Sequence, residues 1–258
     1  MIKEAKIKQT KINRLMQTTS KGLVLLSPWL ASEGYPYELQ QRYRTGGWLK
    51  SIGKGAMVKT GDSLVLSGAI MALQKQANLN VHIGGRSALE VSGLAHYLQV
   101  NTQETTVFVE SKTSLPLWFT NNQWDTSPKI FTASLFKENE ICLTDFQDGE
   151  LTLKISNATC AMMECLSLCP NQFPLTEAYE LMEGLTSLRP AQVQPLLEQC
   201  KSVKVKRLFL YFAERAGHSW FKYINTKQID LGSGVRSLAN DGTFAAKYQL
   251  VLPKEIVQ

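Results

Sequence analysis

The chain has 258 residues, of which 44% are hydrophobic and 19% are charged, and its formal net charge at pH 7 is +6. These values are those of an ordinary globular protein. No stretch reaches the roughly 20 apolar residues of a membrane-spanning helix, and the first ten residues lack the apolar core of a secretory signal, so we expect a cytoplasmic protein without a membrane partner.

The positive charge is concentrated near the N-terminus. Residues 1–60 contain eight lysines and three arginines but only three glutamates, which gives +8, whereas the remaining chain has 17 basic and 19 acidic residues, which gives −2. This division is typical of a module that binds a polyanion, joined to a nearly neutral body. A solvated lysine-rich start accounts for the first few lysines, but not for the basic residues between 42 and 54, which lie in a patterned segment.

Residues 11–59 predict three helices followed by a hairpin. Apolar residues at helical spacing indicate the first helix, around Leu15. After a short apolar run at 23–26, Ser27-Pro28 supplies an N-cap and a first-turn proline for a second helix, which Gly34 ends. Pro36 begins a third helix that runs through Arg44. Two helices joined by a tight turn at a glycine form a helix-turn-helix.

A wing follows the third helix. Residues 48–52 and 56–58 read as two short strands around the turn Gly53-Lys54-Gly55. We therefore expect an α+β protein with an N-terminal winged helix-turn-helix domain over residues 1–62. A larger mixed α/β domain with a helical C-terminal half is expected over residues 63–258.

The third helix has two faces. At 100° per residue, Pro36, Leu39 and Tyr43 fall on the side expected to face the core, and Tyr37, Gln41 and Arg44 fall opposite. Glutamine and arginine can bond bidentately to adenine and guanine edges in the major groove of DNA. An ordinary solvated helix face also favours these residues, but the basic wing and the uneven charge favour DNA. The predicted DNA-contacting residues, with their flanks, are Tyr37, Gln40, Gln41, Arg42, Arg44, Lys50 and Lys54.

The rest of the chain predicts alternating elements and then helices. A helix is expected at 66–76, a strand at 81–83, and a further helix that opens with a capping box at Ser87–Glu90. Gly84-Gly85 lacks the full spacing of a phosphate-binding loop, so we interpret it as a sharp turn for packing. Strands are predicted at 106–109, 129–132, 151–155 and 247–252, and helices at 158–168, 176–187, 190–200 and 202–216.

The cysteines and histidines point to neither a disulfide scaffold nor an enzyme. Cys160, Cys165 and Cys169 lie in an apolar helical run, where buried thiols are the favoured interpretation and a metal site is the alternative. The three histidines are far apart in the sequence, and no nucleophile elbow is present. We therefore predict no catalytic residues, no metal and no cofactor.

A second basic cluster lies at the start of the helix predicted at 202–216. Basic groups at a helix N-terminus oppose the helix dipole, so they do not stabilise that helix electrostatically. The cluster is a candidate site for a phosphate, DNA or an acidic partner, with a solvated face as the alternative. Its members are Lys201, Lys204, Lys206 and Arg207.

Four long blocks resemble the AbiEi family, the antitoxins of abortive-infection AbiE systems, which are type IV toxin–antitoxin modules. The likeness runs from about residue 12 to residue 253. The blocks are GGWLKSIGKGAMVKTGD, VHIGGRSALEVSGLAHYL, ELMEGLTSLRPAQVQPLLEQCKSVKVKRLFLYFAERAGH and IDLGSG.

The resemblance implies a bifunctional protein that is not an enzyme. Its winged helix would bind inverted repeats in its own promoter and repress the operon, with the family's basic and polar residues falling on Gln40, Gln41, Arg42, Arg44, Lys50 and Lys54. Its C-terminal domain would counteract a nucleotidyltransferase-like toxin, AbiEii, without a stable complex. Pro36 departs from the polar residue expected at the start of the third helix, which puts the operator sequence in doubt.

One alternative stays open. In it, the C-terminal domain of a winged-helix regulator senses a small ligand or acts on nucleic acid. An apolar pocket with convergent polar groups within residues 80–250 would favour that alternative.

Overall fold

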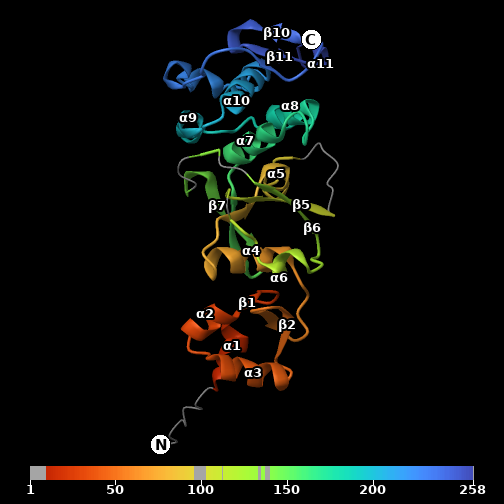
Figure 1. Ribbon diagram of the computed structural model, residues 1–258. Helices are drawn as coiled ribbons and strands as arrows, with labels where there is room; N and C mark the ends of the chain where they lie inside the picture. The colour runs from red at the N-terminus through yellow and green to blue at the C-terminus, as the bar shows by residue number, and fades with distance from the viewer. Residues whose placement is uncertain (1–9, 96–102, 112, 133–134, 137–139, 258) are drawn as a thin grey trace, which may run out of the picture. The chain divides into compact units, whose positions relative to one another are not determined.

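The computed structural model describes residues 10–95, 103–111, 113–132, 135–136 and 140–257. Over these ranges the chain forms eleven α-helices and three sheets, which confirms the predicted α+β class (Figure 1). The chain divides into two compact units. Unit 1 comprises Met1–Val81, Thr113–Pro128 and Phe146–Leu153, and unit 2 comprises His82–Lys112, Lys129–Asp145 and Lys154–Gln258. The boundary expected between residues 62 and 63 stays a prediction.

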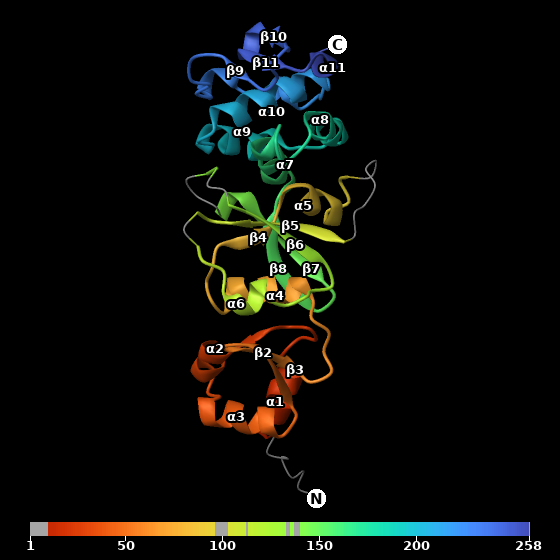
Figure 2. The ribbon, with the colours of Figure 1, turned by 45° about the vertical axis from the view of Figure 1, so that its right-hand side comes forward.

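The N-terminal part of unit 1 has the element order of a winged helix. The elements are α1 (Lys11–Thr18), β1 (Leu25–Leu26), α2 (Ser27–Ser32), α3 (Tyr37–Thr45), β2 (Leu49–Gly53) and β3 (Ala56–Lys59). The strands form an antiparallel sheet in the order β1-β3-β2, with a register shift between Ser51 and Gly53. Figure 2 shows the β2–β3 hairpin beside α1 and α3.

The turn between α2 and α3 forms as expected, but the predicted cap does not. Gly34 has a φ of +85°, a left-handed conformation that glycine adopts without a steric cost. Helix α2 begins at Ser27 itself, with Leu26 as its N-cap and no side-chain cap. Ser27 is buried, and its amide donates to the backbone oxygen of Gly55 at 2.8 Å. The prediction of a Ser27 cap was therefore wrong, because the hairpin turn binds this residue instead.

A five-stranded sheet follows, in the order β6-β5-β4-β8-β7. Four of its strands fall where the sequence predicts them, and β7 was not predicted. Its pairing of β4 with β8 is parallel, with Ile83 opposite Ile155. The strands are β4 (Val81–Ile83), β5 (Glu104–Val109), β6 (Ser127–Thr132), β7 (Leu143–Asp148) and β8 (Leu151–Ser156), and the helices along this stretch are α4 (Leu66–Lys75), α5 (Gly85–Val91) and α6 (Leu117–Thr120).

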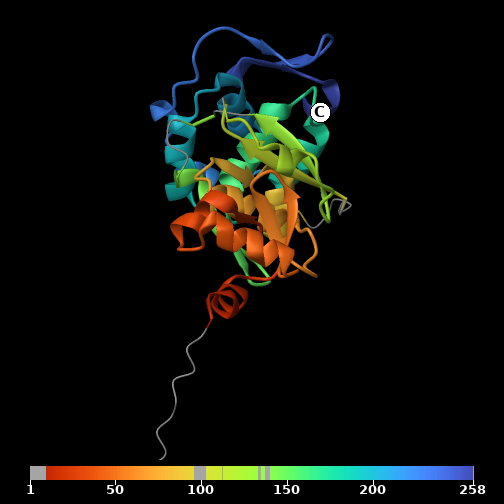
Figure 3. The same cartoon turned by 60° about the horizontal axis from the view of Figure 1, so that its bottom comes forward.

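The C-terminal part of unit 2 is mainly helical, as predicted. Its helices are α7 (Ala158–Leu168), α8 (Leu175–Gly184), α9 (Pro190–Gln199), α10 (Val203–Arg215) and α11 (Lys254–Val257). A small sheet, β10-β11-β9, lies on one side of α10 and is drawn in blue in Figures 1 and 3. Its strands are β9 (Arg236–Ser237), β10 (Thr243–Ala245) and β11 (Leu250–Leu252).

Helix α7 is the centre of unit 2. Every residue from Thr159 to Leu166 is buried, because the helix packs against α5, α8, α9 and α10. Burial on all sides explains the nearly continuous apolar sequence of this helix. In the part of the chain that the structure describes, no helix has the length and apolarity needed to cross a membrane.

Candidate nucleic-acid interface

Helix α3 has a polar exposed face. Tyr37 is 61% exposed, and Gln41 and Arg42 are exposed beside it. Glu38 and Thr45 complete the face, and the wheel drawn from the sequence had left both out. The face therefore presents a phenol, an amide and a guanidinium, which can bind base edges or phosphates, together with the hydroxyl of Thr45 and the carboxylate of Glu38.

The core side of α3 differs from the prediction. Gln40 was expected to flank the DNA surface, but it is only 1% exposed. Its side-chain amide donates to the backbone oxygens of Ser27 at 2.9 Å and Tyr35 at 2.7 Å. Gln40 therefore links the start of α2 to the turn before α3 through buried hydrogen bonds, and its side chain is not available to DNA. Pro36, which was expected in the core, is exposed and precedes the first residue of α3.

Arg44 lies at the margin of the exposed face. It is half-buried, and its guanidinium donates to the side-chain oxygen of Gln41. The two side chains are three residues apart on one helix face, which is the spacing that brings them together. The pair orients Arg44 along the helix surface, and Arg42 lies farther from the core.

The wing presents two of its three lysines to solvent. Lys50 on β2 and Lys54 in the turn are exposed, as predicted. Lys59 is half-buried and donates to the backbone oxygen of Thr19 at 2.8 Å, so it serves the fold of the domain. Gly55 in the turn has a φ of +77°, which a side chain rarely tolerates.

The second basic cluster is not a surface site. Lys204 is half-buried, and its ammonium group donates to the backbone oxygens of Ser167 at 2.8 Å and Cys169 at 2.6 Å. These carbonyls lie at the C-terminal end of α7, where a lysine satisfies otherwise unpaired acceptors. Burial lowers the pKa of Lys204 from its usual range.

Arg207 is even more deeply placed, with 2% of its surface exposed. Its guanidinium donates to the backbone oxygens of Leu231 at 2.8 Å, Gly232 at 3.1 Å, Gly234 at 2.6 Å and Gln249 at 3.2 Å. Lys206 is 4% exposed, which leaves Lys201 as the exposed member of the cluster. The prediction of an anion-binding group was therefore wrong for Lys204, Lys206 and Arg207.

The cysteine prediction holds as far as burial and helix position are concerned. All five cysteines are buried and form no disulfide, and Cys160 and Cys165 lie in α7 with Cys169 directly after it. Burial raises the pKa of Cys160 and of Cys165 well above the usual range, and that of Cys169 to about 12. Within the described ranges, no group of three His, Cys, Asp or Glu side chains is arranged to hold a metal ion.

A buried carboxylate that sequence reasoning missed organises the start of α5. Glu164 accepts hydrogen bonds from the Gly85 amide at 2.8 Å and the Ser156 hydroxyl at 2.9 Å, and it lies 2.7 Å from the His82 ring. A Cβ at Gly84 would lie 2.4 Å from a Glu164 oxygen. The glycine pair is thus used for close packing, as expected. The one sequence signal for a buried role of Glu164 is its position among apolar residues in the run that forms α7.

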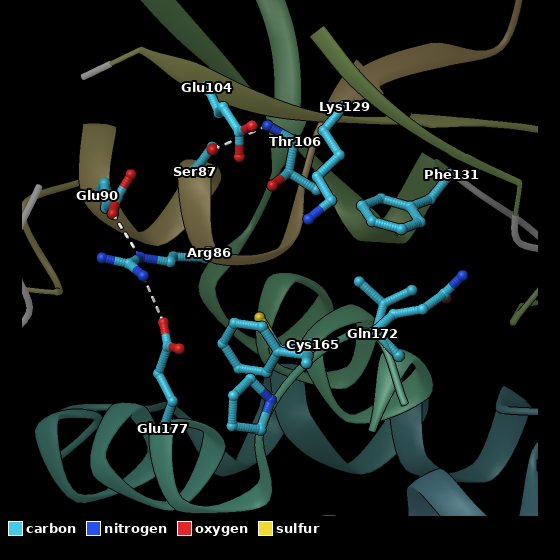
Figure 4. Close-up of a pocket in the computed structure, with 13 residues that line it drawn as sticks. Arg86, Ser87, Glu90, Glu104, Thr106, Lys129, Phe131, Cys165, Gln172 and Glu177 are labelled. Atoms are coloured by element: carbon cyan, nitrogen blue, oxygen red, sulfur yellow. Dashed lines mark hydrogen bonds and ion pairs between the residues drawn. The ribbon is translucent and has the colours of Figure 1, made fainter. Parts of the chain in front are cut away.

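The predicted capping box at Ser87–Glu90 does not form. Helix α5 begins two residues earlier, at Gly85, and the Ser87 hydroxyl accepts from the Thr106 amide at 2.9 Å. Glu90 accepts from Arg86 at 2.7 Å, and Glu177 accepts from the same guanidinium at 2.5 Å. Figure 4 shows Arg86 between the two carboxylates.

A cavity of about 210 Å³ opens beside this ion-pair network in unit 2. Figure 4 shows Lys129 and Phe131 on one side of it and Cys165 on the other. The cavity is lined by both charged and apolar side chains, and Arg86 is already bound to two carboxylates. It is smaller than the roughly 300–1,000 Å³ typical of small-molecule sites.

A winged-helix arrangement with exposed basic and amide side chains, followed by a large α+β body, is the architecture of a winged-helix transcriptional regulator. Comparison with family models gives the particular family. Residues 8–100 match the model described as "Transcriptional regulator, AbiEi antitoxin N-terminal domain", and residues 102–253 match "Transcriptional regulator, AbiEi antitoxin, Type IV TA system". The chain belongs to the AbiEi family of transcriptional regulators and antitoxins of type IV toxin–antitoxin systems, which confirms the resemblance.

The solved structure of the RV2827C protein from Mycobacterium tuberculosis is similar to this chain over most of its length. The TM-score is 0.56 at 13% sequence identity, and the match covers 93% of this chain and 89% of that chain. At this identity the similarity shows a shared fold alone. No curated protein matches the chain.

Proposed function

We propose that this protein represses its own toxin–antitoxin operon by binding promoter inverted repeats through α3 and the wing. Its remaining domain counteracts an AbiEii-like nucleotidyltransferase toxin without a stable complex and without catalysis. The observation that carries the DNA part is the exposed set Tyr37, Gln41 and Arg42 on α3, together with Lys50 and Lys54 on the hairpin. The AbiEi membership supports both parts.

The two elements have different roles in this proposal. Gln41 and Arg42, with Arg44 beside them, read base edges from α3, since amide and guanidinium groups bond bidentately to adenine and guanine. Lys50 and Lys54 contact backbone phosphates, because an ammonium group acts as a point charge without base preference.

Titration of the full-length protein with its promoter duplex and with a scrambled duplex tests the DNA part. If about five phosphates are neutralised, log K falls against log salt with a slope of about −4 to −5. Arg44→Ala is expected to cost about 1–3 kcal/mol on the operator and much less on scrambled DNA, whereas Lys54→Ala weakens both similarly. Lys227→Ala, which removes an exposed lysine of unit 2, is the control. A salt-insensitive affinity, or equal losses from Arg44→Ala on both duplexes, contradicts the proposal.

Growth assays test whether the two activities separate. An Arg44→Ala/Lys54→Ala chain is expected to lose repression of a promoter reporter while still protecting cells that express the cognate toxin. Loss of protection by this variant at normal cellular abundance argues against a separate antitoxin surface.

A second candidate function is the sensing of a small ligand in unit 2, and the cavity beside Arg86 is the observation that favours it. The pairing of Arg86 with Glu90 and Glu177 weakens this candidate, since a ligand must compete with two carboxylates. A fragment screen by thermal shift tests this candidate, and Phe131→Ala, which alters the lining of the cavity, is the control for binding elsewhere. A ligand that raises Tm and changes operator affinity supports sensing, and its absence leaves repression and toxin neutralisation as the function.

A further inference from the structure

The wing is held in place by contacts with a segment that lies more than 60 residues downstream of it in the sequence. The side-chain amide of Asn122 donates to the backbone oxygen of Ile52 on β2 at 2.7 Å, and also to the oxygen of Trp118 at 2.6 Å. One planar amide thus joins the strand that carries Lys50 to helix α6. All of these residues belong to unit 1.

The next residue of the wing makes a close steric contact with the same segment. Gly53 has a φ of +149°, and a Cβ placed on it would lie 2.7 Å from the Cβ of Trp118. Trp118 is buried, and it meets Phe119 and Trp124 edge-on in an aromatic cluster. The indole of Trp124 donates to the backbone oxygen of Phe119 at 2.9 Å, which fixes the cluster further.

The contacts of Asn122 and Trp118 are made to the part of the wing that its own sheet supports least. Strand β2 is at the edge of the sheet order β1-β3-β2, so it has a strand partner on one side only. Its pairing is irregular between Ser51 and Gly53, directly before the turn that holds Lys54. A two-stranded hairpin is marginally stable alone and depends on packing against another element.

We propose that the segment Leu117–Trp124 is a positioning element of the DNA-binding surface, which holds the wing so that Lys54 reaches a phosphate. Asn122 and Trp118 touch no DNA in this proposal; they act through β2. The inference rests on the proposed function, and it adds a requirement that residues 1–62 do not meet by themselves. Loss of the contacts of Asn122 and Trp118 with β2 leaves α3 intact but lets the wing move.

Two glycine substitutions separate this contact from backbone strain. Gly53→Ala and Gly55→Ala both place a side chain at a positive φ, but only the first collides with Trp118, since nothing lies within 4 Å of a Cβ on Gly55. Hydrogen exchange of the full-length protein without DNA is the first readout. Gly53→Ala and Asn122→Ala are expected to speed the exchange of amides 50–58 at least tenfold and to leave the exchange rates of the α3 amides unchanged. Gly55→Ala is expected to change the exchange rates of the turn amides alone.

Coupling to Lys54 is the second readout. By counterion release, one neutralised phosphate contributes about fivefold to affinity in 0.15 M salt, so Lys54→Ala is expected to weaken binding of the unmodified chain about fivefold and reduce the salt slope by about 1. In the Asn122→Ala background the same substitution is expected to have less than a twofold effect. Arg44→Ala is the matched control, and its effect is expected to be the same in both backgrounds.

The outcomes separate the inference from the proposed function. Faster exchange in the wing together with a lost Lys54 effect supports the positioning role. A full fivefold Lys54 effect in the Asn122→Ala chain overturns it while leaving DNA binding by the wing in place. Absence of DNA binding by the unmodified chain overturns the proposed function and this inference with it. Should Asn122→Ala unfold, Asn122→Leu, which keeps about the same size, removes the donor and adds no charge, takes its place in both measurements.

Discussion

Replacement of Arg207 tests whether the basic start of α10 is structural. Its guanidinium donates to four backbone oxygens of residues 231–249 and is 2% exposed. A hydrogen bond to a charged group contributes about 1.5–3 kcal/mol, but bonds of one network are not additive. A buried carbonyl that is left without a donor costs about 1–3 kcal/mol, and Arg207 serves four of them. We therefore expect Arg207→Leu to lower the free energy of unfolding by about 3–5 kcal/mol.

Arg207→Lys and Lys201→Leu provide the comparison. A lysine keeps the charge but lacks the planar fork that reaches several carbonyls, so about half of the loss is expected to remain. Lys201 is exposed at the same helix start, and its replacement is expected to change stability by less than about 0.5 kcal/mol. Urea unfolding followed by tryptophan fluorescence is the assay, since Trp220 packs against Phe209 of α10. A stable Arg207→Leu chain that fails only to protect cells from the toxin refutes the structural assignment.

Three further predictions follow from buried groups. Gln40→Ala is expected to lower the free energy of unfolding by about 1–3 kcal/mol, because two buried carbonyls lose their donor. Gln41→Ala is expected to leave stability unchanged and to weaken operator binding. Urea unfolding measures the first effect, and titration with the operator duplex measures the second. Because burial raises the pKa of Cys160, Cys165, Cys169 and Cys200, these thiols are expected to resist alkylation at pH 8.5 in the native chain and to react once it is unfolded, as mass spectrometry measures. Purified protein is expected to contain no stoichiometric zinc by elemental analysis, and zinc that is lost on Cys165→Ser would contradict this.

The elements that the sequence predicted well are those with local signals. The apolar run of α7 begins after Asn157, whose side chain accepts from the Cys160 amide, so the predicted bounds of 158–168 are those observed. The wing likewise follows from two short apolar runs around Gly53 and Gly55, because the turn residues themselves dictate the hairpin. Each of these signals lies within a few residues of the element that it specifies.

The predictions that failed concern contacts between residues far apart in the chain. The wheel of α3 treated Gln40 as polar and therefore outward, but Ser27, 13 residues earlier, supplies a buried acceptor for it. Strand β7 was missed because its sequence, LTDFQD, has no fully buried position. No element was predicted between the strands at 106–109 and 129–132, where α6 lies, and the hydrogen bond from Asn122 of this segment to the wing has no local sequence signal.

Arg207 and Asn122 have the same physical role in different units. Each is a multiple donor that satisfies backbone carbonyls of a segment that secondary structure alone does not fix, the strand β2 for Asn122 and the residues between η3 (Thr226–Gln228) and β11 for Arg207. Buried carbonyls require such partners, so a basic or amide side chain at an electrostatically poor position can indicate an intramolecular acceptor rather than a ligand. An anionic partner is therefore better sought among exposed cations, and Arg42, Lys50 and Lys54 are the exposed cations of the predicted DNA-contacting set.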